Sequence, residues 1–319
     1  EGKEIEQNLE EAIKMYRLGY EQGNLNAMQR LARCHDEGIG VEQDKEEAKR
    51  MYIEMSNKAL ELSRGVEWEK DGEIEWGFDE RNGRHIIKGK GPLEDYADGS
   101  KTSQMRDYGD WEDNKRSPWM KKYLDQINSV VICHGVSSIG EHAFSYCTNL
   151  KSVALPNSVT SIGEWAFGGC STLESITIPD SVSSIGDYSF YGCKGLISII
   201  IPNSVTSIGL RAFEDCKGMI SITIPNSVSS IGEWAFSQCE RLVTVTIPSS
   251  VTAISKYLFY NCKRLASVTI PNPATEIGDS AFRGCSGLEC VSIPNSVTSI
   301  GYSAFGGCSS LASVVIPNS

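Results

Sequence analysis

The cysteines are the residues of this chain with the most distinctive chemistry. The sequence holds eleven of them, and no C-x-x-C pair occurs, so a zinc site is not indicated. Eight recur at a fixed interval of 23 residues, from Cys147 to Cys308. We predict that these eight form one inward-facing column of structural thiols, because buried cysteine behaves as a small apolar residue. Cys34, Cys133 and Cys290 fall outside the interval and are predicted to be the reactive thiols.

The remaining residues that could catalyse a reaction or bind a metal form no recognisable set. Five aspartates lie in one polar loop but lack the ordered D-x-[DN]-x-[DN]-G spacing of a calcium site. No phosphate-binding glycine loop and no G-x-S-x-G motif occurs, and the histidines have no evident nucleophile nearby. We therefore predict a protein that is not an enzyme and has no cofactor or metal. The aspartates are Asp95, Asp98, Asp107, Asp110 and Asp113, and the histidines are His35, His85, His134 and His142.

The composition narrows the class of partner. With a net charge of −11 and 40% apolar residues, the chain is expected to be soluble and to contain two or three domains. Neither half of the sequence offers a basic stripe, so nucleic acid is not an expected ligand. No apolar run approaches the roughly 18 residues of a membrane span. Because the sequence begins at Glu1 without an apolar leader, it is expected to be a mature form or an excised part of a longer protein.

One phrase of 23 residues is written eight times in succession between Val131 and Val314. The second copy reads ALPNSVTSIGEWAFGGCSTLESI, and phenylalanine recurs at the same interval from Phe144 to Phe305. A fixed period of this length indicates a solenoid, in which each unit buries its apolar face only against its neighbours. The predicted fold class is an α+β repeat protein whose main part is a solenoid of eight 23-residue repeats with a parallel sheet.

Each segment of one copy has an expected conformation. Residues 175–179 alternate like a strand that ends at a proline, and Asn-Ser then begins a turn. The next segment, Glu-Trp-Ala-Phe, is predicted to be short and helical or 3₁₀, and the glycine before it to require a positive φ. Irregular stacking is expected in repeat six, where Ser255 replaces that glycine, and in repeat seven, where Pro273 and Ala274 replace Ser-Val.

Two columns of side chains are candidates for ligand contact. The first lies two residues after the glycine position, on the expected convex side of the solenoid. Trp, Tyr and Arg dominate binding hot spots, so this column can be a contact surface. The alternative is that the rings only stack on one another and shield the turns. Its candidate contacts are Trp165, Tyr188, Arg211, Trp234 and Tyr257.

The second column consists of hydroxyl side chains on the expected concave face of the sheet. Solenoids commonly bind partners on this face, whereas Ser and Thr are also ordinary strand residues, so both interpretations stay open. Ile200 interrupts the row. The candidate contacts are Ser175, Thr177, Ser221, Thr223, Thr244, Thr246 and Thr269.

The residues before the repeats divide into two regions. Apolar residues at helical spacing fill residues 10–23 and 25–37, and Asp44 can cap a third helix that runs to about Ser63. Residues 64–130 combine a hairpin signal at Asn82-Gly83, a polar loop and a short helix over 118–127, and this region is expected to cap the open edge of the solenoid. The predicted domains are 1–63 (helical repeats), 64–130 (cap) and 131–319 (solenoid).

These motifs carry two family resemblances. The phrase I-P-x-S-V-T-S-I-G-x-x-A-F-x-x-C-x-x-L-x-S-[IV] resembles the BspA-like leucine-rich repeats of bacterial surface proteins, which implies a surface-exposed or secreted solenoid for adhesion or protein binding. The helical region is similar to the Sel-type repeat of the tetratricopeptide superfamily, which implies a protein-binding adaptor. This match covers about one and a half repeats, so either earlier repeats are missing or the helices pack on the next part of the chain. Its residues are Ala12, Tyr16, Gly19, Gly23, Asn24, Ala27, Leu31, Ala32, Gly38, Gly40, Val41, Asp44, Ala48 and Tyr52.

Two functions are held as hypotheses. The first is a non-catalytic interaction or adhesion module, on a cell surface or secreted, that binds a protein or glycoprotein through the faces of the solenoid. The second is a cytoplasmic scaffold that assembles partner proteins through the helical repeats. Because the sequence stops at Ser319 with no cap, self-association through an exposed last strand is a further expectation.

Overall fold

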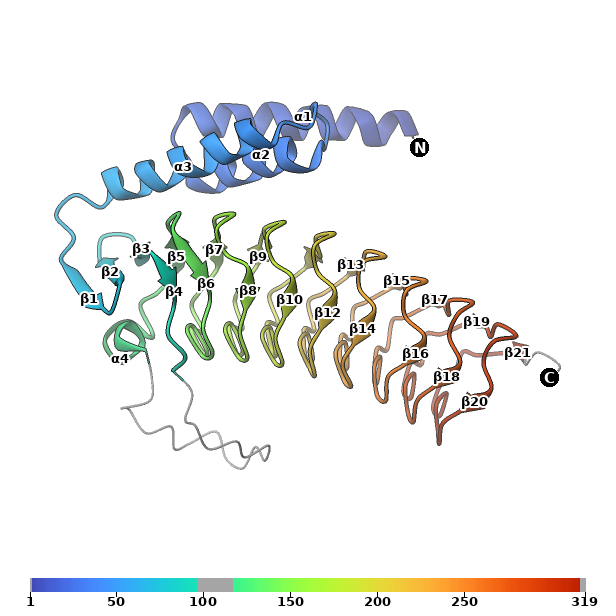
Figure 1. Ribbon diagram of the computed structural model, residues 1–319. Coiled ribbons are helices and arrows are strands. Elements are labelled where there is room, and N and C mark those ends of the chain that lie inside the picture. The colour runs from blue at the N-terminus through green and yellow to red at the C-terminus, as the bar shows by residue number, and fades with distance from the viewer. Residues whose placement is uncertain (1, 97–116, 316–319) are drawn as a thin grey trace.

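The protein is a solenoid with a layer of helices along one side of its N-terminal end (Figure 1). The computed structural model describes residues 2–96 and 117–315. The helices are α1 (Gly2–Glu21), α2 (Leu25–Glu37) and α3 (Lys45–Leu62). They are followed by strands β1 (Trp68–Asp71), β2 (Ile74–Asp79), β3 (Arg84–Gly89) and β4 (Gly91–Pro92) and by helix α4 (Pro118–Tyr123).

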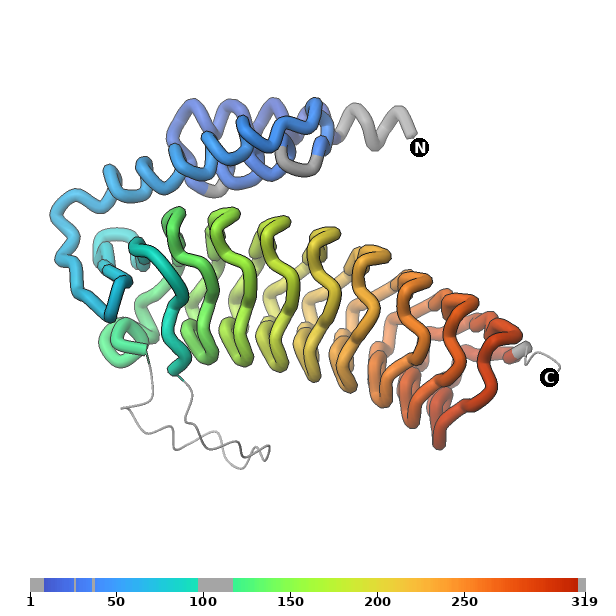
Figure 2. Tube along the Cα trace, in the orientation of Figure 1, coloured from blue at the N-terminus to red at the C-terminus, as the bar shows by residue number. Residues whose placement is uncertain are grey.

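Each repeat then adds one strand to each of two parallel sheets, and the turns follow one another along a single axis (Figure 2). The pairing keeps the period of the sequence, so that Ser267 lies opposite Cys290 and Val268 opposite Val291. The long sheet contains β5 (Ser129–Ile132), β7 (Ser152–Ala154), β9 (Ser175–Ile176), β11 (Ser198–Ile200), β13 (Ser221–Thr223), β15 (Thr244–Thr246), β17 (Ser267–Thr269), β19 (Cys290–Ser292) and β21 (Val314–Val315). The short sheet contains β8 (Ser161–Ile162), β10 (Ser184–Ile185), β12 (Ser207–Ile208), β14 (Ser230–Ile231), β16 (Ala253–Ile254), β18 (Glu276–Ile277) and β20 (Ser299–Ile300), and β6 (Val136–Ser138) pairs with β4.

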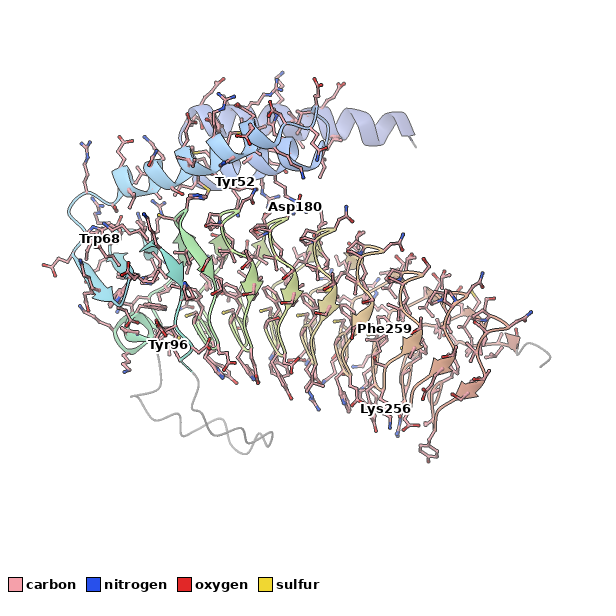
Figure 3. The ribbon with its side chains drawn as sticks, in the orientation of Figure 1. Tyr52, Trp68, Tyr96, Asp180, Lys256 and Phe259 are labelled. Atoms are coloured by element: carbon pink, nitrogen blue, oxygen red, sulfur yellow. The ribbon has the colours of Figure 1, made fainter. Side chains whose placement is uncertain are left out.

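The interior is built from columns of identical side chains. Neighbouring rings of the phenylalanine column stack with centroids 5.3–5.7 Å apart, and the column begins on Trp119 of α4, 5.8 Å from Phe144. Figure 3 shows Phe259 inside the turns and Lys256 at their outer edge. A buried ring of this size favours folding by roughly 1.5–3 kcal/mol. The stacked turns and these columns confirm the predicted solenoid.

The cysteine column lies beside the phenylalanines and is buried as predicted from Cys147 to Cys285, with Cys308 half buried in the last complete turn. From Cys170 onward each thiol donates a hydrogen bond to a phenylalanine carbonyl one turn earlier, for example Cys170 Sγ to Phe144 O at 3.1 Å. Burial also raises the pKa of Cys147 to about 12. Each thiol is thus a second donor to a buried carbonyl that already accepts a backbone N–H within its own turn, for example Phe144 O from Cys147 N.

The recurring Ile-Gly pair of the repeat corrects one expectation. Gly163 and Gly232 do not have the positive φ that the sequence suggested. A Cβ on Gly232 would instead lie 2.4 Å from the backbone N of Leu210, so glycine is needed because successive turns approach closely there. The positive φ falls two residues later, on non-glycine residues such as Trp165. The segment Glu-Trp-Ala-Phe after the glycine is a series of turns, where a short helical or 3₁₀ segment was expected.

Repeat six contains the irregularity expected from Ser255, whereas repeat seven does not. The short sheet stops at β14 and resumes at β16, and Ser255 Oγ donates to Ile231 O in place of the backbone N–H of the usual glycine. Strand β18 of repeat seven pairs with both neighbours, and Ala274 is fully buried, so the prediction for Pro273 and Ala274 was wrong. The long sheet has its own interruption, between β9 and β11.

The segment before the repeats extends both sheets. Strand β3 pairs antiparallel with β2 and parallel with β5, so the hairpin continues the long sheet, and β4 pairs with β6. In the regular repeats, a carbonyl such as Ala166 O accepts a hydrogen bond from a backbone N–H of the preceding turn. No repeat precedes Ala143, and Trp119 Nε1 donates to its carbonyl instead, at 3.0 Å. Helix α4 ends at Tyr123, short of the expected Ile127, although Ile127 is fully buried in the same core.

The helical layer packs on the solenoid. This agrees with the expectation that so few Sel-type repeats would pack on the next part of the chain. Asn24 and Asp44 cap α2 and α3. Residues of these helices share a core with Val131 and Ala154 of the long sheet, and Gln29 Nε2 donates to Leu155 O. Tyr52 lies at this junction (Figure 3). None of the described helices is both long and apolar enough to cross a membrane.

The glycine column predicts a stability difference between two positions of the same repeat site. We expect Gly232→Ala to lower the free energy of unfolding by about 1–3 kcal/mol, because the new Cβ forces neighbouring turns apart. Urea denaturation followed by circular dichroism measures the change. Ser255→Gly is the matched control and should cost less than about 1 kcal/mol, since it adds no Cβ and restores the residue found at this position in the other repeats. Equal losses at both positions would contradict the close-approach explanation.

Candidate interaction surfaces

The outer face of the long sheet, named here the long-sheet face, brings the hydroxyl candidates together. One row holds Thr223, Thr246 and Thr269 on adjacent strands, and a parallel row holds Ser221 and Thr244. All five are exposed, whereas Ser175 and Thr177 are half buried. The helical layer packs on the N-terminal end of this face, at Val131 and Ala154.

The row that contains Thr223 begins under the helices. Its first two members are Val131 and Ala154, which are 4% and 2% exposed and belong to the core that these residues share with α2 and α3. The fourth member is Ile200, which is paired with Thr223 and 46% exposed. The long-sheet face is therefore closed at its start and open from β11 onward.

Exposed isoleucines lie at this opening, and sequence reasoning missed them as a group. Ile197 and Ile220 are 52% and 37% exposed and precede β11 and β13, beside Ile200. The backbone N of Ile220 donates to Ile197 O at 2.8 Å, so the two residues are neighbours on successive turns. The signal was present in the sequence, because other repeats have Lys151, Glu174 or Glu289 at this position.

The aromatic candidates form one continuous stack along the turn segments. Trp165 and Tyr188 are parallel at 4.8 Å, and Trp234 and Tyr257 at 3.9 Å. Arg211 fills the place between the two pairs, with its guanidinium carbon 4.7 Å from the Trp234 ring centre and 5.9 Å from that of Tyr188. All of these residues have a left-handed backbone, with φ of 53–60°. Ring faces are thus occupied within the column, which leaves mainly ring edges and half-buried side chains for a partner.

Arg211 also neutralises a buried carboxylate. Glu214 is 2% exposed and accepts hydrogen bonds from Arg211 Nη1 at 2.6 Å, from Gln238 Nε2 and from Ser237 Oγ. Burial raises the pKa of Glu214, and the charge of Arg211 opposes that shift. On the same edge, burial and the neighbouring Glu141 and Asp187 raise the pKa of Glu164.

The histidines are placed for packing. His85 is fully buried between Trp76 and Trp119, and burial lowers its pKa to about 3. His142 stacks on Trp165, and burial lowers its pKa to about 4. Both rings are therefore neutral at physiological pH. Among the described residues, no group of three or more His, Cys, Asp or Glu side chains is placed to hold a metal ion.

The remaining candidates from the sequence have different outcomes. Cys290 is exposed on β19, but Cys34 and Cys133 are buried, and burial raises the pKa of Cys133 to about 12. The expectation that the latter two are reactive was therefore wrong. Asp95 accepts a hydrogen bond from the backbone N of Glu141. The other four loop aspartates, Asp98, Asp107, Asp110 and Asp113, lie outside the described residues.

A hollow of about 450 Å³ lies where β1, β2, α4 and the segment after α3 meet. Phe78 and Tyr123 form part of its wall and stack at 4.2 Å. Its rim charges are largely used within the fold, since Arg81 binds Asp79 and Lys122 binds Glu69, each at 2.7 Å. Sequence reasoning could not find this hollow, because its walls come from four separate segments.

Comparisons with known proteins identify both repeat types. The family model described as BspA type leucine-rich repeat region (6 copies) matches residues 122–220 and 206–319, and the Sel1 repeat matches residues 1–24 and 25–59. No curated protein matches the sequence.

Several solved structures are similar to this chain in sequence and in part of their structure. The leucine-rich repeat protein TpLRR of T. pallidum is 25% identical over 77% of this chain and 91% of its own, with a TM-score of 0.46. A leucine rich cell surface protein of Faecalibacterium prausnitzii is 24% identical over 79% of this chain and 95% of its own, with a TM-score of 0.30. The pneumococcal vaccine antigen PcpA is 18% identical over 79% of this chain and 70% of its own, with a TM-score of 0.46.

The Arg211–Glu214 pair predicts a pH dependence of stability. The pKa of Glu214 is raised above its ordinary 4.5 in the folded protein, so its protonated form contributes stability that is lost as pH rises through the folded pKa. Glu214→Gln should therefore gain stability relative to the natural protein as pH rises from acid to neutral. Arg211→Ala should lose about 3 kcal/mol at neutral pH, because it leaves the carboxylate buried and unpaired. Urea midpoints over a pH series test this, and parallel profiles for the natural protein and Glu214→Gln would contradict it.

Proposed function

Because the chain belongs to the BspA type leucine-rich repeat family, whose model matches well over half of it, we propose that it is an adhesion module displayed on a bacterial surface or secreted. Leucine-rich and Sel1 repeats are scaffolds for protein interaction, and a stack of such units presents a large continuous surface. The proposed ligand is a protein or glycoprotein. The proposed role is binding without catalysis.

The open part of the long-sheet face is the observation that carries this proposal. From β11 onward its outward side chains are exposed and arranged in straight rows, with Thr223, Thr246 and Thr269 at one spacing. A regular, rigid array of hydroxyl and methyl groups offers hydrogen bonds and apolar contact without any ordering cost for the face itself. We rank the aromatic column second, because its ring faces are already in contact with one another.

We also propose that the parts of the chain have separate roles. Residues 131–319 bind the ligand, residues 64–130 close the first turn, and residues 1–63 cover the start of the long-sheet face. The shared core of α2 and α3 with Val131 and Ala154 supports the last role. The partly exposed Val297, Phe305 and Leu311 in the last turn make self-association at that end a secondary proposal.

A cytoplasmic scaffold that acts through the helices is the alternative function. The observation that favours it is the exposure of Met15 and Leu18 on one side of α1, at 61% and 48%. These two residues are three positions apart and therefore share a helix face, which a second protein can cover.

The location can be tested on intact source cells. We expect trypsin to digest the full-length protein on the surface of intact cells, with a cytosolic protein left intact as control, because a displayed solenoid is accessible to protease. Immunoblots before and after cell lysis provide the measurement. Protection of the protein until lysis would overturn the surface proposal and direct attention to the helical face of α1.

The binding face can be tested separately. We expect Thr223→Glu with Thr246→Glu to weaken adhesion of the purified, labelled protein to target cells by about tenfold or more, because each new carboxylate must be desolvated at the interface. Flow cytometry measures the bound protein. The matched control is Thr206→Glu with Thr252→Glu, since both threonines are exposed but precede strands of the short sheet. Equal binding by both double variants and the natural protein would exclude the long-sheet face.

A further inference from the structure

A basic and apolar ridge borders the open long-sheet face. It consists of the residues between the cysteine column and the long sheet in four successive turns: 194–197, 217–220, 240–243 and 263–266. Each turn contributes one apolar residue to a single row: Ile197, Ile220, Val243 and Ala266. Backbone hydrogen bonds of 2.8–3.2 Å connect each member of the row to the next. At about 4.8 Å per turn, the row is about 14 Å long.

The ends of the row are marked by charge. Glu174 precedes Ile197 and Glu289 follows Ala266 at the equivalent positions, and both glutamates are exposed. The apolar stretch is therefore confined to these four turns, and Ile197 and Ile220 are its large exposed members. Ile200, at the far end of β11, enlarges the apolar surface across the strand.

The same turns concentrate positive charge. Five of the nine basic residues after residue 130 lie here, in a chain whose net charge is −11. Two carboxylates, Asp215 and Glu240, bind the lysines at 3.0–3.8 Å. Arg241 and Arg264 are exposed, and no described carboxylate lies within ion-pair distance of either. The basic residues are Lys194, Lys217, Arg241, Lys263 and Arg264.

The expectation that the sequence contains no basic stripe therefore needs correction at this ridge. Net charge summed over each half conceals it, because carboxylates on the opposite edge of the solenoid, such as Glu141, Glu164 and Asp187, offset it. The ridge keeps a positive excess, because its five basic residues meet only Asp215 and Glu240 among the carboxylates that form ion pairs there.

We propose that the ridge binds an acidic amphipathic helix of a partner protein, which deepens and rests on the proposed binding function of the long-sheet face. A helix advances about 5.4 Å per turn, close to the spacing of the apolar row, so apolar residues at i, i+4 and i+7 meet Ile197, Ile220 and Val243 in turn. Acidic residues beside them meet Arg241 and Arg264. Charge-assisted pairs of this kind fix the orientation of the helix.

The chain itself shows that this sheet accepts helices. Helices α2 and α3 already pack on Val131 and Ala154, and these residues belong to the row that continues to Ile200. The ridge row itself is left open by these helices, because its equivalent positions in the first turns, Asn128 and Lys151, are exposed. An anionic polysaccharide would use the arginines but has no apolar face for the isoleucines, which is why a protein helix is favoured.

Binding of designed peptides to the full chain tests the proposal. The probe is a synthetic helical peptide of about five turns with leucine at i, i+4, i+7 and i+11 and glutamate on the flanking positions. Fluorescence anisotropy should detect saturable binding to the natural protein. Arg241→Glu with Arg264→Glu and, separately, Ile197→Ser with Ile220→Ser should each weaken it at least tenfold. The control variant Lys256→Glu with Arg283→Glu, on the turn segments, should bind normally.

Each alternative result has a defined meaning. Failure of the glutamate peptide to bind overturns the proposal, as does equal binding of a matched peptide with lysine in place of glutamate. Loss of binding only in the arginine variant, together with tighter binding of a heparin fragment, identifies an anionic-polymer site and also overturns it. Cell adhesion that survives both ridge variants but not Thr223→Glu with Thr246→Glu would exclude the ridge and leave the long-sheet function standing.

Discussion

The close approach of successive turns is the constraint on which the whole structure depends. At the Ile-Gly position the backbone of one turn donates to the previous one at 2.7–2.9 Å, and a Cβ on Gly232 or Gly301 would lie 2.4 Å from a backbone nitrogen. This spacing stacks each phenylalanine on the next and stacks the rings of the aromatic column, such as Trp165 and Tyr188. It also brings the cysteine thiols, from Cys170 onward, to a carbonyl of the preceding turn. Ser255 shows the effect of relaxing it, because the short sheet is interrupted where that side chain is present.

Most of the fold could be predicted from the sequence because one period determines it. Phe167 and Cys170 identify buried columns by repetition alone, and Asp44 and Asn24 mark helix starts that the structure confirms. The glycine was misinterpreted because a sequence does not distinguish a residue required for positive φ from one required for space. The residues that do adopt positive φ include Trp165 and Tyr188, which no propensity argument would select.

The surfaces were less accessible to sequence reasoning. Thr223 and Thr246 were identified correctly as members of an outward row, because strand alternation predicts direction. Which part of this face is covered depends on where α2 and α3 pack, and that contact joins residues more than 100 positions apart, as in the bond from Gln29 to Leu155. The ridge was missed for a related reason, since Arg241 and Arg264 become one surface only when the turns are stacked. Burial likewise raises the pKa of Glu214, while the hydrogen bond from Gln238 of the next turn opposes that shift.

The two interruptions in the sheets are staggered. The long sheet breaks between β9 and β11, where the short sheet runs unbroken through β8, β10 and β12, and the short sheet breaks between β14 and β16, where the long sheet runs through β13, β15 and β17. At each interruption of one sheet, the strands of the other sheet are therefore still paired. Backbone pairing thus joins the turns on at least one side at both interruptions, so neither interruption by itself forms a hinge.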